Sequence, residues 1–216
     1  ASIFQPPVDE SGPFGYLAEK ASTNLLLQSE DFTTTWTTIN ASVVANVAVA
    51  PDGTTTMDRL AVGTTDNRHM VYQQPVNPVG TTNYTASVYM KDDGAGFGGI
   101  TFSDAPTTAH IAVVVDLSTG LVTDTSVGTS YGTIVASGCE DVGNGVYRVW
   151  VSGTLGVSAN GYIFPFTSNA AVPAAWLNGA PEYAGVLGED ILVWGAQAEL
   201  GTYPTSYIPT TTTAVT

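Results

Sequence analysis

The sequence is poor in cysteine, in basic residues and in long apolar runs, and each shortage excludes a class of protein. Its 216 residues include one cysteine, Cys139, so no disulfide can form within the chain. Its five Lys and Arg residues stand singly, whereas nucleic acid and anionic lipid are bound by basic residues in clusters. No run approaches the roughly 18 apolar residues that a membrane-spanning helix needs. We therefore expect no nucleic-acid partner and no membrane association.

The first residues carry neither a basic segment nor an apolar segment after it, so we predict no signal peptide. Residues 1–20 are rich in Pro and Gly, which favours an extended N-terminal arm. The remaining residues, 21–216, are predicted to form one domain, because all-β domains often exceed 200 residues.

Nineteen acidic residues against five basic ones give a net charge of −14, which suits a protein that must stay dispersed in solution.

Short alternating or apolar segments between turn signals recur from Asn24 onward and predict an antiparallel β-sandwich. Two tight turns, Leu117–Gly120 and Gly143–Gly145, are typical of β-hairpins. Residues 202–213, rich in Thr and Pro, are predicted to run as a strap along the outside. The predicted strands are Asn24–Gln28, Thr55–Val62, His69–Val76, Tyr84–Lys91, Gly99–Ser103, Ala109–Asp116, Leu121–Thr125, Thr133–Ser137, Val146–Thr154, Gly161–Phe166 and Asp190–Leu200.

Motifs that would indicate catalysis or a cofactor are absent or misplaced. Gly94, Gly96 and Gly99 have dinucleotide-site spacing, but a predicted strand follows them where a helix is required. The two histidines, His69 and His110, form no metal-ligand pair, and a Cys139 nucleophile would need a histidine close in space. We expect no catalytic residues, no enzyme activity and no cofactor.

Four pairs of neighbouring acidic residues leave a structural calcium ion as an alternative, because calcium prefers loop oxygen ligands. We expect solvated turn carboxylates instead, since no segment matches an EF-hand loop. The pairs are Glu30–Asp31, Asp92–Asp93, Glu140–Asp141 and Glu189–Asp190.

Aromatic residues suggest a binding face, because sugars stack their C–H faces on Trp and Tyr. Strand alternation places Tyr147, Val149 and Val151 inward, and likewise Ala86, Val88 and Met90. In the last strand it predicts a core set of Leu192, Trp194, Ala196, Ala198 and Leu200. If the three strands are neighbours, their other sides form one carbohydrate-binding patch, with an ordinary solvated sheet face as the alternative. The predicted patch is Tyr89, Lys91, Arg148, Trp150, Gln197 and Glu199.

Several ordered segments between residues 15 and 212 resemble a family of phage tail-fibre and virion-surface domains with folds similar to carbohydrate-binding modules. The segments are Gly15–Lys20, Asn24–Phe32 with Trp36, Ala50–Thr56, Tyr84–Lys91, Asp116–Gly120, Gly143–Arg148, Leu192–Gly201 and Thr205–Thr210.

The resemblance implies a two-sheet antiparallel jelly-roll sandwich on the virion surface, in contact with other virion proteins and often trimeric. It implies a non-enzymatic protein, either a tail-fibre tip or a capsid decoration, that attaches to host or environmental glycans. Two alternatives remain open: a structural capsid decoration or cement protein without a ligand, and an accessory carbohydrate-binding module of a secreted polysaccharide-degrading enzyme.

Overall fold

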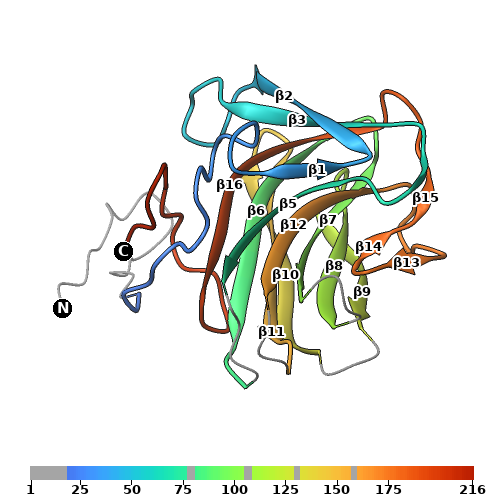
Figure 1. Ribbon diagram of the computed structural model, residues 1–216. Helices are drawn as coiled ribbons and strands as arrows, with labels where there is room; N and C mark the ends of the chain where they lie inside the picture. Colours follow the sequence, from blue (N-terminus) through green and yellow to red (C-terminus); the bar gives the residue numbers. More distant parts are fainter. Residues whose placement is uncertain (1–18, 77–80, 105–108, 129–131, 157–159) are drawn as a thin grey trace, which may run out of the picture.

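The computed structural model describes residues 19–76, 81–104, 109–128, 132–156 and 160–216. In these residues the chain forms two six-stranded antiparallel sheets packed face to face as a sandwich (Figure 1). These residues contain no helix, and hence none long and apolar enough to cross a membrane. The predicted all-β sandwich is confirmed.

The first sheet has the strand order β1-β5-β12-β7-β8-β9 and the second has the order β10-β11-β6-β16-β3-β2. The first sheet comprises β1 Thr37–Ile39, β5 Met70–Val76, β12 Gly161–Ser168, β7 Phe97–Ser103, β8 His110–Asp116 and β9 Leu121–Val127. The second comprises β10 Thr133–Gly143, β11 Val146–Thr154, β6 Tyr84–Asp93, β16 Asp190–Leu200, β3 Met57–Val62 and β2 Ala41–Ala48. Short pairs join β13 Trp176–Leu177 to β14 Ala180–Pro181, and β15 Tyr183–Ala184 to β4 Asp66–Asn67.

The chain crosses between the sheets from β5 to β6, from β6 to β7, from β9 to β10 and from β11 to β12, in the manner of a jelly roll. The main core lies between the two inner faces. The first sheet contributes residues such as Ile100, Phe102 and Ile111, and the second contributes Val88 and Val149. The alternation predicted for β6 and β11 is confirmed, because all six residues expected to face inward belong to this core.

Strand prediction failed at Asn24–Gln28, and it missed the edge strands β1 and β2 and the short strands β4, β13, β14 and β15. Residues 24–28 form a single bridge, between Asn24 and Val215, instead of a strand. The unpredicted strand β2 lies at a sheet edge, and most of its residues are exposed. Apolar and polar residues alternate along a strand only when one of its faces is buried, so the sequence of this edge strand did not show the pattern that predicts a strand.

The predicted C-terminal strap lies on the outer face of the second sheet. The Ser152 hydroxyl on β11 donates to the Thr202 carbonyl at 2.8 Å, and the Gln197 side-chain oxygen on β16 accepts from the Ile208 amide at 2.8 Å. At its far end the strap meets Asn24, whose buried side chain donates to the Ile208 carbonyl and accepts from the Ala198 amide. The predicted N-terminal arm, residues 1–20, lies outside the described residues except for Glu19 and Lys20.

Candidate functional site

The strands that carry the predicted patch are neighbours, as expected, in the order β11-β6-β16. The register places Arg148 opposite Tyr89, and Tyr89 opposite Trp194. The six predicted residues are therefore brought to one outer face of the second sheet. Ligand access to that face depends on what covers it.

The strap covers the β16 part of this face. Gln197 and Glu199 are both fully buried. The Glu199 carboxylate accepts hydrogen bonds from the Ser22 hydroxyl, the Gln197 amide, the Thr205 backbone amide and the Thr205 hydroxyl, at 2.5–2.9 Å. The expectation that Gln197 and Glu199 are open to a ligand is therefore wrong, because the chain's own strap occupies their polar atoms.

The middle of the face is also closed. Arg148 is 6% exposed; its guanidinium lies 5.5 Å from the centre of the Tyr89 ring and donates to the Ser87 hydroxyl. Tyr89 is buried against Trp194 and against Tyr207 of the strap. Tyr89 therefore helps to hold the strap on the sheet.

At the margin, Trp150 is half-buried against Tyr203, with ring centres 5.5 Å apart, and the Lys91 ammonium donates to the Asn144 carbonyl. Of the predicted patch only Lys91 and Trp150 keep substantial exposure. Sugar binding by these two residues stays a prediction.

A β-bulge explains why the predicted core set of β16 is wrong. The pairing with β6 shifts between Trp194 and Gln197, where Gly195 has a φ of +60°. Ala196 and Ala198 belong to the main core, as predicted, but Leu192 and Trp194 pack in a second cluster with Tyr89 on the outer face. Leu200 is 51% exposed. Because the bulge exchanges the two faces of the strand, simple alternation cannot hold along its whole length.

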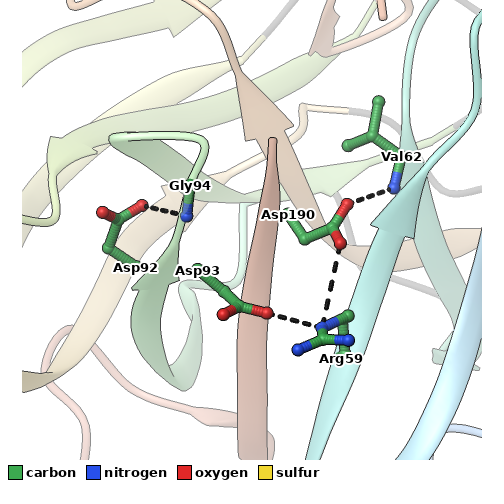
Figure 2. Close-up of polar contacts among 6 residues, drawn as sticks. All are labelled: Arg59, Val62, Asp92, Asp93, Gly94 and Asp190. Carbon is green, nitrogen blue, oxygen red and sulfur yellow. Dashed lines mark hydrogen bonds and ion pairs between the residues drawn. The ribbon is translucent and has the colours of Figure 1, made fainter. Parts of the chain in front are cut away.

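Three of the acidic residues considered for calcium, Asp92, Asp93 and Asp190, make contacts within the chain itself. The Arg59 guanidinium forms ion pairs with Asp93 and Asp190, and Asp190 also accepts from the Val62 amide (Figure 2). Asp92 accepts from the amides of Gly94 and Gly96. Among the described residues no group of three or more His, Cys, Asp or Glu is arranged to hold a metal ion.

A groove on the edge of the first sheet was not predicted. Strand β1 pairs with β5 only from Met70 to Tyr72, so within the described residues the next part of β5 has no strand beside it on that side. The side-chain amide of Gln73 partly fills this gap, because it accepts from the Leu27 amide and donates to the Leu27 carbonyl. A groove of about 550 Å³ remains beside it, lined by Leu25, Leu27, Thr35, Thr37, Tyr72, Gln73, Gln74, Pro75 and Tyr162.

Two tyrosines form the aromatic side of this groove. Tyr72 on β5 and Tyr162 on β12 are half-buried and meet edge to face, with ring centres 5.7 Å apart. The exposed side chains of Thr35, Thr37 and Gln74 place hydroxyl and amide groups in the same groove. Aromatic rings offer an apolar face and a polar tip, and pockets that combine such rings with a few polar groups are typical small-molecule sites. This groove is therefore an open candidate site in the described part of the chain.

No protein-family model matches the chain, and no curated protein matches its sequence. Solved structures with a similar arrangement include the enzymatically active domain of tailspike protein 4 from bacteriophage CBA120, with 15% identity and a TM-score of 0.45. Another is the Clostridium thermocellum xylanase 10B, whose CBM22-1 and GH10 modules were complexed with xylohexaose, with 10% identity and a TM-score of 0.44. A third is a carbohydrate esterase from the Shiga toxin-encoding bacteriophage phi24B, with 14% identity and a TM-score of 0.37.

The matched regions differ in extent. They cover 82%, 87% and 83% of this chain, but 21% of the tailspike chain, 29% of the xylanase chain and 99% of the esterase chain. The chain therefore spans less than a third of the first two proteins. At these identities and TM-scores, none of the three assigns an activity or a ligand to it.

Proposed function

We propose that this chain is a non-enzymatic carbohydrate-binding domain of a phage surface protein, and that it binds glycan in the Tyr72–Tyr162 groove. The observation that carries the proposal is the groove itself. It combines two accessible aromatic rings with exposed hydroxyl and amide groups, at a place where strand pairing is interrupted. The phage setting rests on the ordered sequence segments that resemble virion-surface domains, as does a trimeric assembly.

The test is a glycan array probed with the wild-type protein and with single variants. We expect Tyr72→Ala and Tyr162→Ala each to weaken binding about tenfold, the loss that one aromatic contact of about 1.4 kcal/mol produces. Tyr203→Ala is the matched control, because Tyr203 is a 65% exposed tyrosine on the strap over the other sheet. Circular dichroism and thermal unfolding confirm that each variant is folded.

Three outcomes would contradict the proposal in different ways. Loss of binding in Trp150→Ala with none in Tyr162→Ala would move the site to the strap face. Binding by neither the wild type nor the variants would refute a carbohydrate-binding role and favour a structural decoration protein. Absence of the chain from purified phage particles, measured by mass spectrometry, would refute the virion setting.

A further inference from the structure

A second aromatic pocket lies on the outer face of the same sheet. It has a volume of about 390 Å³ and is lined by His110, Ser126, Val127, Gly128, Trp176, Leu177 and Asn178. The rings of His110 and Trp176 are nearly parallel, at 16°, with centres 6.1 Å apart. The His110 Nε2 atom lies 3.0 Å from the Ser126 hydroxyl. An aromatic wall is thus combined with a hydroxyl and an amide, as in the first groove.

The hairpin β13–β14 holds this pocket in shape. Its two turn residues, Asn178 and Gly179, both have positive φ, at 50° and 88°, which fits a two-residue hairpin turn. The Gly179 carbonyl accepts a 2.5 Å hydrogen bond from the Thr101 hydroxyl on β7, and Trp176 packs edge-on against Phe166 on β12. The hairpin is therefore anchored to two strands of the sheet, and the Asn178 side chain is presented from a fixed turn.

Sheet register places the two pockets at opposite ends of one row of residues. Tyr162 lies opposite Ser103 on β7, and Ser103 lies opposite His110 on β8. Since neighbouring strands are about 4.8 Å apart, Tyr162 and His110 are separated by two spacings, about 10 Å across the sheet. A chain molecule lying at right angles to the strands would span this distance by passing over Ser103, which is itself fully buried.

The lining of the two pockets also limits the charge of the ligand. None of the described lining residues is Asp, Glu, Lys or Arg, and His110 is the one titratable group apart from the tyrosines. Beside the lining, the Arg68 guanidinium donates to the Leu177 carbonyl at 3.4 Å. An anionic ligand would nevertheless approach a chain of net charge −14. The lining thus favours a ligand recognised through stacking and neutral hydrogen bonds.

From these observations we infer that the His110–Trp176 pocket is a second sugar subsite, and that the ligand is an uncharged linear glycan crossing the strands from Tyr72 and Tyr162 to Trp176. The inference rests on the proposed function, because it extends the same face. It adds that affinity depends on chain length: a short oligosaccharide fills one pocket, whereas a longer one fills both.

The experiment uses an array of graded chain lengths, from disaccharide to hexasaccharide. It carries neutral xylo-, cello-, manno- and agaro-oligosaccharides together with anionic oligogalacturonides and sialylated glycans. The full chain is probed as wild type, Tyr162→Ala, Trp176→Ala and Asn178→Gly. Asn178→Gly keeps a residue that tolerates the positive φ and removes the whole amide side chain, so it tests the pocket even if Trp176→Ala perturbs the hairpin.

We expect the wild type to bind one neutral series with a signal that rises with length. Trp176→Ala should weaken binding of the longest chains about tenfold and leave the shortest unchanged, and Asn178→Gly should show the same pattern with a smaller loss. Tyr162→Ala should weaken binding at every length.

Each outcome that differs from these expectations refutes a different part of the inference. If the wild type binds a neutral series and both hairpin variants bind all lengths as it does, the second subsite is refuted and the proposed function stands. If only anionic glycans bind, the uncharged ligand class is refuted. If nothing binds, the proposed function fails, and this inference fails with it.

Discussion

Glu199 offers the sharpest test of how the strap is held, because it is a fully buried carboxylate with no basic partner among the described residues. Its two oxygens receive different donors. Oε1 accepts from two N–H groups, those of Gln197 and of the Thr205 backbone, whereas Oε2 accepts from the hydroxyls of Ser22 and Thr205. This division predicts unequal effects for two substitutions, Glu199→Ala and Glu199→Gln.

Glu199→Ala removes the acceptor for both N–H groups. The Gln197 amide then keeps only longer contacts, of 3.3 and 3.5 Å, to the Thr205 hydroxyl and the Ser206 carbonyl. A buried donor without an acceptor costs about 1–3 kcal/mol, so two of them lower the free energy of unfolding by roughly 2–6 kcal/mol. Glu199→Gln places a carbonyl oxygen at Oε1 and an amide at Oε2, where the two hydroxyls can rotate to accept. Its expected cost is about 1 kcal/mol.

Urea unfolding at neutral pH measures both values, and limited proteolysis reports whether residues 202–213 come away from the sheet. We expect Glu199→Ala, but not Glu199→Gln, to be cut in this segment before global unfolding. The reasoning is refuted if Glu199→Ala lies within about 1 kcal/mol of the wild type, or if the two variants are equally destabilised.

Three further predictions concern single residues. Gly195→Ala should lower the free energy of unfolding by roughly 2–4 kcal/mol, because its Cβ would lie 2.8 Å from the Tyr89 ring at a φ of +60°; an unchanged urea midpoint would contradict this. Burial raises the pKa of Asp58, against the lowering effect of hydrogen bonds from the Asn46 and Phe32 amides. Its stabilising contribution is then fully present below the unfolded pKa of about 3.9 and is lost as the pH rises through the raised folded pKa. Asp58→Asn should remove this part of the pH dependence in urea unfolding, and an unaltered profile would contradict it. Burial, with a further contribution from Asp141, raises the pKa of the Cys139 thiol to about 12. Ellman's reagent at pH 8 should therefore label native protein far more slowly than protein in urea, and equal rates would overturn this.

The sequence predicted those parts of the fold that depend on local pattern. Alternation placed Val88 and Val149 correctly, because β6 and β11 have one face in the main core and run without a bulge in their mutual pairing. The same rule failed at Trp194, since a strand sequence does not reveal the bulge at Gly195, where a Cβ would lie 2.8 Å from the Tyr89 ring and 3.4 Å from the Tyr207 ring.

The candidate groove was missed for a different reason. Tyr72 and Tyr162 meet only because β5 and β12 are neighbours, and three strands of each sheet, β6 to β11, lie between them in the sequence. Each tyrosine alternates with core residues, Val71 and Ile163, so the same outward sorting could have marked both as surface aromatics. The sequence does not reveal which strands are neighbours. It also does not reveal that the strap packs over the predicted patch and closes it.

The contacts of Asn24 set a limit on how this protein can fold. Its side chain bonds residues 172, 174 and 184 positions away, at Ala196, Ala198 and Ile208. Closing loops of that length costs chain entropy before any of these bonds forms, and all-β domains rich in distant pairings fold in milliseconds to seconds. During synthesis, the Asn24 side chain cannot form these three hydrogen bonds until nearly the whole described chain has left the ribosome. Docking of the strap is therefore a late step, and a nascent chain halted before Ala196 carries its polar Asn24 side chain without its native partners at Ala196, Ala198 and Ile208.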